Sequence, residues 1–211
     1  MPLALARRSA RSKWPTLKPR RAPAVDSPRM RLFVGIPLSS EVRTKLATSL
    51  EPAIAKAGGW RWALPDTWHL ILLFLGNTSP ERCDLVSARL RAIQSPAVSV
   101  QLEGFDFFER DGIFLAGVSV CPALSALHQK VSEAGAQSGF EAEMRPYHPH
   151  ITLARAQGKV RSQTIRALRD TLPAHPEFPP FLAEEFLLFE SFLGQAGARY
   201  EVRERFALTG I

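Results

Sequence analysis

Two short apolar segments, each carrying a histidine, constrain the fold of this chain more than any other feature. The first runs from Trp68 to Gly76 and contains His69, and the second runs from Tyr147 to Arg155 and contains His150. Both have the length and composition of buried strands. A fold that pairs or faces these two strands would bring the histidines to one place.

Alternation along a strand gives each histidine a defined neighbour. Successive side chains point to opposite faces, so His150 and Thr152 share a face and place an imidazole beside a hydroxyl. His69 and Ile71 share a face in the same way, and there the neighbour is apolar. Arg155 has the opposite parity to His150, so it reaches the same face only if the strand bends before it.

The chain of 211 residues is long enough for one compact unit with a full core. No apolar run approaches the roughly 18–20 residues that span a bilayer, so we expect no membrane segment. Cys83 and Cys121 have neither a disulfide-framework nor a zinc-site spacing, which fits a reducing compartment. We therefore expect a cytoplasmic monomer that holds no metal and no other cofactor.

The net charge of +7 is concentrated at one end of the chain. Of the 27 basic and 20 acidic residues, eight and one precede Met30, which leaves 19 of each sign in the rest. The body is neutral, so its bulk charge indicates no partner. Residues 1–29 are rich in Arg, Pro, Ala and Ser, which predicts a disordered basic extension ahead of a single domain at 30–211.

Three interpretations of residues 1–29 stay open. The segment could be a basic arm that contacts RNA phosphates, or a basic, acid-poor targeting leader. It could also be a mis-called extension with Met30 as the true start, because a strand pattern opens abruptly there. The lack of a sustained apolar stretch argues against a secretory signal.

The rest of the chain alternates between helical and strand patterns. Capping residues and apolar spacing predict helices at 40–57, 80–93, 122–138 and 162–172. Strand patterns occur at 31–36, 68–75, 98–107, 113–120, 147–155, 181–193 and 200–208. The two halves repeat one order, so we expect an α+β fold of two similar lobes. Each lobe would be a mostly antiparallel sheet with outer helices, and His69 and His150 would meet in the cleft between them.

Paired histidines suit general acid–base catalysis on a phosphate ester. Histidine titrates near neutrality, so one ring can accept a proton while another donates one. On a cyclic phosphate ester, one imidazole would deprotonate an attacking water and the other would protonate the departing ribose oxygen from the opposite side of phosphorus. The Thr152 hydroxyl would donate to a non-bridging oxygen. This chemistry needs no metal.

Both histidine strands also carry a family resemblance. The run His150-Ile151-Thr152-Leu153, between Tyr147-His148-Pro149 and Ala154-Arg155, resembles the second motif of the two-histidine phosphoesterases. More narrowly, it is similar to that of the RNA 2′,3′-cyclic phosphodiesterases, historically called 2′-5′ RNA ligases. The segments 30–37 and 69–76 match the same family in order and spacing, so the resemblance covers the chain from about Met30 onward.

The resemblance implies a bilobal fold and a metal-independent reaction. RNA with a 2′,3′-cyclic phosphate end would be hydrolysed to a 2′-phosphate, and the family also implies reversible 2′-5′ joining. It implies that His69 is the proton donor and His150 the proton acceptor, two roles that the residues alone leave interchangeable. RNA with a cyclic phosphate or 2′-phosphate end is the implied partner.

One position departs from the family pattern. Ile71 stands where the first motif has Thr or Ser, so one of two phosphate-facing hydroxyls is missing. A hydrogen bond to a charged group is worth about 1.5–3 kcal/mol, roughly ten- to over a hundredfold in rate if it forms only in the transition state. A second hypothesis is therefore an RNA-end-binding module with weakened catalysis. A third is a cyclic phosphodiesterase that acts on small nucleotides.

Three further residues are candidate substrate contacts. The Arg155 guanidinium suits bidentate phosphate binding, although a solvated charge at a strand end is an equal alternative. The rings of Trp62 and Tyr147 could stack on a ribonucleotide base, although such rings more often belong to a core. Trp60 shares a face with Trp62 just ahead of the first histidine strand.

Overall fold

The computed structural model describes residues 29–141, 143, 145–158, 162–174, 176–194 and 197–209. The basic extension predicted at 1–29 lies outside these residues except for Arg29, so its three interpretations stay predictions, as does the domain boundary at residue 30. None of the helices in the described part of the chain is long and apolar enough to cross a membrane.

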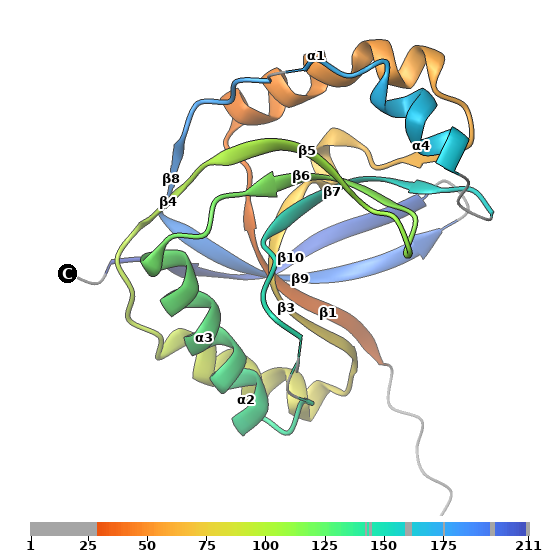
Figure 1. Cartoon of the computed structure of the whole chain (residues 1–211). Helices are drawn as coiled ribbons and strands as arrows, with labels where there is room; N and C mark the ends of the chain where they lie inside the picture. Colours follow the sequence, from red (N-terminus) through yellow and green to blue (C-terminus); the bar gives the residue numbers. More distant parts are fainter. Residues whose placement is uncertain are drawn as a thin grey trace, which may run out of the picture.

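Eight strands form one antiparallel sheet through the middle of the molecule (Figure 1). They are β1 (Met30–Pro37), β2 (Trp60–Trp62), β3 (His69–Thr78), β5 (Leu102–Phe108), β6 (Ile113–Val118), β7 (His150–Ala156), β9 (Glu185–Gly194) and β10 (Gly197–Ala207). The order across the sheet is β10-β9-β1-β3-β7-β6-β5, and β2 also pairs with β7. A separate pair is formed by β4 (Val98–Val100) and β8 (Phe181–Ala183).

The sheet has the fewest paired residues where the two histidine strands meet. β3 and β7 pair only through Leu70 and Ile151, whereas β3 pairs along its length with β1 and β7 pairs along its length with β6. This junction divides the sheet into a first lobe of β10, β9, β1 and β3 and a second lobe of β7, β6, β5 and β2. His69 and His150 each lie one residue before the paired residues Leu70 and Ile151, so the two histidines have equivalent positions on their strands.

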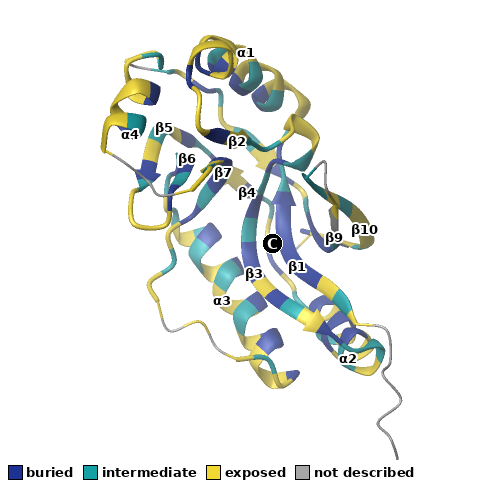
Figure 2. Cartoon of the chain, turned by 90° about the vertical axis from the view of Figure 1, so that its right-hand side faces the viewer, coloured by how far each residue is buried: buried dark blue, intermediate teal, exposed yellow. Residues whose placement is uncertain are grey.

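Four helices flank the sheet. They are α1 (Ser40–Lys56), α2 (Pro80–Arg91), α3 (Pro122–Gln137) and α4 (Ser162–Arg169). Figure 1 shows α1 and α4 together over the second lobe, and α2 and α3 together at the first. α1 begins where the Ser39 hydroxyl accepts a hydrogen bond from the Val42 amide at 3.3 Å, and it buries Val42, Leu46 and Leu50. In Figure 2 these helices turn exposed faces outward, while the inner strands are largely buried.

The predicted α+β fold of two antiparallel lobes with flanking helices is confirmed. Each of the four helices forms within a few residues of its predicted bounds. The predicted hairpin forms between β5 and β6. Two features were not predicted from the sequence. One is β2, a strand of only three residues, and the other is the pairing of β4 with β8, some eighty residues away in the chain.

Candidate active site

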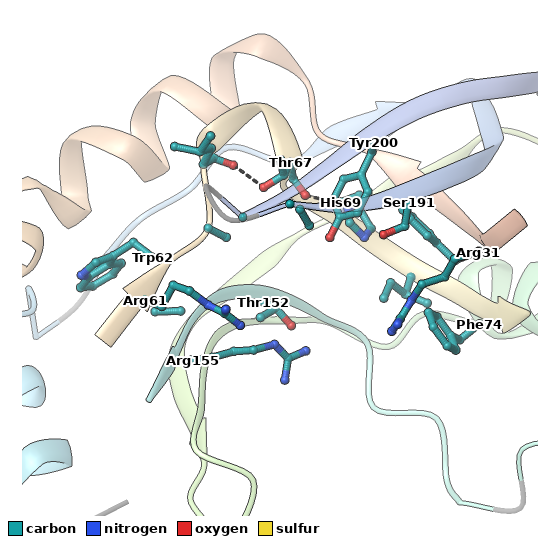
Figure 3. A pocket seen from close by; sticks show the side chains of 18 of the residues that line it. Arg31, Arg61, Trp62, Thr67, His69, Phe74, Thr152, Arg155, Ser191 and Tyr200 are labelled. Carbon is teal, nitrogen blue, oxygen red and sulfur yellow. Dashed lines mark hydrogen bonds between the residues drawn. The ribbon is translucent and has the colours of Figure 1, made fainter. Parts of the chain in front are cut away.

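A pocket of about 620 Å³ has walls from both lobes. Both histidines line it, together with Thr152, Arg155 and Trp62. Figure 3 shows His69 and Thr152 on facing sides of the same hollow. The structure thus brings together five of the six candidate site residues, although their roles stay predictions.

The two imidazoles are anchored in the same way. Nδ1 of His69 lies 2.7 Å from the carbonyl oxygen of Thr67, and Nδ1 of His150 lies 2.8 Å from the carbonyl oxygen of His148. A carbonyl oxygen can only accept, so Nδ1 carries the proton in both neutral rings. Nε2 of each ring is therefore the nitrogen that can take up or release a proton.

The strand register makes the two histidines diagonal neighbours. Leu70 pairs with Ile151 in an antiparallel sense, and continuing that register by one residue sets His69 across from Thr152 and His150 across from Ile71. Diagonal positions on one face of an antiparallel pair are roughly 7–8 Å apart at the backbone. Both imidazoles therefore enter one pocket from adjoining strands.

A β-bulge on each histidine strand redirects the residue five places after the histidine. On β7, Thr152 and Ala154 pair with consecutive residues of β6, so Leu153 is the extra residue. The bulge inverts the alternation beyond it, and Arg155 therefore lines the pocket despite its odd offset from His150. This bulge is the bend that Arg155 needs to reach the same face as His150.

The first of two bulges on β3 lies at the equivalent place, and the second is at Leu75. Ile71 and Leu73 pair with consecutive residues of β1, which makes Leu72 the extra residue. Phe74 is thereby turned to the pocket, as Arg155 is on β7. From the histidine onward, the first six residues of the two strands also share one pattern of buried and exposed positions.

Gly35 on β1 allows the backbone and ring at His69 and Leu70 to pack closely against it. A Cβ atom at position 35 would lie 2.8 Å from the carbonyl oxygen of Leu70 and 3.5 Å from Cδ2 of His69. The first of these distances is shorter than real Cβ contacts allow. Glycine is thus required for β1 to pack this closely against the first histidine strand.

Aromatic rings enclose His69 more fully than His150. His69 is stacked on Phe33 at a centroid distance of 4.5 Å and has Tyr200 edge-on at 5.0 Å, whereas His150 has Phe108 edge-on at 4.9 Å. Burial lowers the pKa of His69 to about 4, against the opposing hydrogen bond to the Thr67 carbonyl.

Burial also lowers the pKa of His150. The hydrogen bond to the His148 carbonyl opposes this shift, and the positive charge of Arg155 adds to it. Both rings are therefore neutral at pH 7 in the free protein, and each offers an unprotonated Nε2.

Three arginines make the pocket positive. Arg31, Arg61 and Arg155 line it, and no acidic side chain lies among the described lining residues. Arg61 and Arg155 are direct cross-strand partners on β2 and β7, an arrangement of like charges that is destabilising unless an anion lies between them. Within the described residues, no group of three or more histidine, cysteine or carboxylate side chains could hold a metal ion.

The two aromatic candidates differ in position. Trp62 lines the pocket and has its ring edge-on to Phe114 at 5.8 Å. Tyr147 is not among the lining residues; its ring stacks on His128 at 3.7 Å, and its hydroxyl donates to the Ile71 carbonyl oxygen at 3.1 Å. Tyr147 thus supports the backbone of the first histidine strand from outside the pocket.

Five polar residues of the pocket were not predicted from the sequence. They are Arg31, Arg61, Thr67, Ser191 and Tyr200. Arg31 and Arg61 lie on strands where parity could have been read, but nothing in the sequence says which face of β1 or β2 meets the cleft. Ser191 and Tyr200 are cross-strand partners at the far end of the chain.

A pair of identically anchored histidines in a positive pocket between two lobes defines the class of two-histidine phosphoesterases. Residues 68–188, more than half of the chain, match the model of the 2′-5′ RNA ligase superfamily. The chain belongs to this superfamily.

Curated relatives and solved structures agree. A protein of Escherichia coli K12 named RNA 2′,3′-cyclic phosphodiesterase is 31% identical over 85% of this chain and 97% of its own length. One of the same name from Geobacillus stearothermophilus is 32% identical over 86% of this chain, which spans 58% of that relative's length. The crystal structure of E. coli LigT complexed with 3′-AMP has a TM-score of 0.72 at 28% identity, and the match covers 87% of this chain and 99% of that one.

Proposed function

We propose that this protein hydrolyses 2′,3′-cyclic phosphate ends of RNA to 2′-phosphates, with two histidines as acid and base and without a metal. The observation that carries the proposal is the matched pair of imidazoles, each with Nδ1 held by a backbone carbonyl and Nε2 free. The positive pocket around them suits an anionic ester. Relatives named RNA 2′,3′-cyclic phosphodiesterase support the substrate class, and the chain is an enzyme of the phosphoric diester hydrolase class.

The proposed reaction is a single in-line displacement. Nε2 of His150 takes a proton from water as the water oxygen bonds to phosphorus. The bond between phosphorus and O3′ breaks on the opposite side, and Nε2 of His69 donates a proton to that oxygen. The products are a 2′-phosphate and a free 3′-hydroxyl, and a later proton exchange with solvent restores both rings. The same steps with a ribose 5′-hydroxyl in place of water would break the same P–O3′ bond and join two RNA ends through a 2′-5′ phosphodiester, and their reverse would cleave that linkage.

His69 has to take up its proton when the substrate binds. Burial lowers its pKa to about 4, so the ring is neutral at pH 7 while the pocket is empty. A bound phosphate anion favours the charged form of an adjacent imidazole and raises its pKa. Binding is therefore coupled to proton uptake at His69, which prepares the acid only when an ester is present.

The other pocket residues stabilise charge and orient the RNA. The Thr152 hydroxyl, across from His69, donates to a non-bridging phosphate oxygen. The Arg155 guanidinium binds the same phosphate with Arg61 opposite it, which offsets the repulsion between the two cations. Trp62 contacts the RNA from the second lobe. Tyr147 acts indirectly, through its hydrogen bond to the Ile71 carbonyl.

We propose that the protein acts as a monomer in the cytoplasm. His69, His150 and Thr152 line one pocket, so one molecule can supply both acid–base groups and a phosphate ligand. Cys83 and Cys121 are free thiols, a state that a reducing compartment maintains.

A second candidate function rests on Ile71. Its side chain packs against the apolar cluster of Phe33, Leu187 and Phe189, so it gives the phosphate no hydrogen bond. On this alternative the protein holds RNA ends in the same pocket and turns them over slowly or not at all.

Hydrolysis of an oligonucleotide with a 2′,3′-cyclic phosphate end, measured in EDTA with the full-length protein, separates the two functions. We expect conversion to the 2′-phosphate, and a loss of about 10²–10⁴-fold in His150→Ala, the usual contribution of a general acid or base. His148→Ala is the matched control, because the His150 anchor is the backbone carbonyl of residue 148 and not its ring. Tight binding without hydrolysis by the unaltered protein would favour the binding module. A faster reaction with mononucleotide cyclic phosphates would favour a small-nucleotide substrate.

A further inference from the structure

The two histidine strands share one backbone plan but present different side chains to the pocket. On β7 the positions two and five after the histidine are Thr152 and Arg155, both suited to a phosphate. On β3 the same positions are Ile71 and Phe74, both apolar. The pocket therefore has one wall with the chemistry of phosphate recognition and one wall without it.

Phe74 is the exposed member of the apolar wall. It lines the pocket with 51% of its surface accessible, and the Arg31 guanidinium lies 5.1 Å from its ring centroid. Arg31 forms no ion pair with any described residue. Figure 3 shows Phe74 and Arg31 together at one end of the pocket, away from Trp62 and Arg61 at the other.

The direction of the displacement decides which wall meets the nucleoside; this step rests on the proposed function. In an in-line reaction the attacking water and the departing ribose oxygen lie on opposite sides of phosphorus. With His69 as the proton donor, the ribose lies on the β3 side. The base attached to that ribose, or to the preceding one, then lies along the wall that carries Ile71 and Phe74.

We propose that Phe74, flanked by Arg31, is a stacking platform for a nucleobase of the RNA end. Stacking of a base on an aromatic side chain strengthens binding by about 5- to 160-fold. The exposed contact between Arg31 and Phe74 that a base would displace is worth only about 2- to 5-fold. Stacking of a base on Phe74 is therefore more favourable than the contact between Arg31 and Phe74 that it replaces. The displaced guanidinium can then pair with a backbone phosphate. Because any base has a π-face, the platform selects for the presence of a base and not for its identity.

Phe74→Leu tests the platform, because it keeps an apolar side chain and removes the ring face. The change is measured with three substrates: methyl riboside 2′,3′-cyclic phosphate, which has no base, adenosine 2′,3′-cyclic phosphate, and the dinucleotide ApA with a 2′,3′-cyclic phosphate end. We expect kcat/KM to fall about 5- to 160-fold on substrates with a base at the platform and to stay unchanged on the base-free ester. A loss already present with the adenosine ester assigns the terminal base, and a loss that appears only with the dinucleotide assigns the preceding one.

Phe192→Leu is the matched control. Phe192 is also an exposed phenylalanine, 36% accessible, with the Arg199 guanidinium 4.7 Å from its ring centroid, but it is not among the pocket-lining residues. It should leave all three reactions unchanged, and Phe74→Trp should retain the preference for a base. An equal loss on all three substrates in Phe74→Leu, or no loss on any, would overturn the platform.

A binding measurement keeps this inference separate from the proposed reaction. The dissociation constant of adenosine 2′-monophosphate for the full-length protein needs no turnover, and it should rise in Phe74→Leu by the same factor if the terminal base is held. A protein that turns over no cyclic ester but shows this rise would refute the proposed hydrolysis and retain the platform. Unchanged affinity for both adenosine 2′-monophosphate and the 2′-phosphate of ApA would refute the platform alone.

Discussion

β3 and β7 place His69 and His150 on one backbone plan, yet the two histidines have different surroundings. Each Nδ1 is held by the carbonyl two residues earlier, and each strand has a bulge three residues after the histidine. Around His69 the contacts are aromatic and apolar, whereas His150 is followed by a hydroxyl and a guanidinium that face the pocket. The backbone therefore holds the two histidines in equivalent positions, and the neighbouring side chains give each one a different environment.

The burial of His69 among aromatic rings predicts the largest effect. It is an effect on how the free energy of unfolding depends on pH. Its pKa is 6.5 when exposed and about 4 in the folded protein, so the unfolded chain binds a proton that the folded one does not. Burial of the neutral His69 ring contributes fully to stability above pH 6.5. As pH falls from 6.5 toward 4, protonation of this histidine in the unfolded chain lowers the free energy of unfolding by about 3 kcal/mol.

Denaturant unfolding at pH 7, 5.5 and 4.5 measures this contribution. His69→Phe keeps a ring stacked on Phe33 but cannot titrate, so its free energy of unfolding should fall less steeply over this interval. The carboxylates and the other histidines, including His150 with its own lowered pKa, titrate in both proteins and cancel in the difference. Parallel pH curves for the two proteins would show that His69 is not buried as a neutral ring.

The hydroxyl on β7 predicts the next effect. Thr152→Val removes the proposed donor to the phosphate and keeps the shape of the side chain. We expect kcat on a cyclic phosphate end to fall by roughly ten- to over a hundredfold, since a hydrogen bond to a charged group is worth about 1.5–3 kcal/mol. Steady-state kinetics should show the loss mainly in kcat if the bond strengthens in the transition state. A change confined to KM would mean that Thr152 binds the ground state equally well.

The sequence predicts the common plan of the two strands better than the differences between them. Alternation and strand length are local properties, so the shared face of His150 and Thr152 follows from the sequence alone. The placement of Arg155 does not, because it depends on a bulge at Leu153 that forms only against β6. For the same reason, nothing in the sequence pointed to Phe74 as a pocket residue.

Side chains from distant strands are harder still to predict. Tyr200 reaches His69 because β10 pairs with β9 and β9 pairs with β1, a chain of non-local pairings. Tyr147 looks like a pocket residue in the sequence because it precedes the second histidine strand, but its hydroxyl bonds to the first strand from outside the pocket. Tertiary pairing decides both cases, and neither leaves a local signal.

Giving β3 the hydroxyl that β7 already has predicts the smallest effect. Ile71→Thr should raise kcat on a cyclic phosphate end by at most about tenfold, the low end of a hydrogen bond to a charged group, because position 71 packs against an apolar cluster. Ile71→Val is the matched control, since it removes the same methyl group from contact with Phe33, Leu187 and Phe189 without adding a hydroxyl. The gain is therefore the ratio of the threonine to the valine variant, measured in folded proteins of known melting temperature. A threonine variant no faster than the valine variant would mean that residue 71 does not face the phosphate, and that the asymmetry of the two strands serves the nucleoside alone.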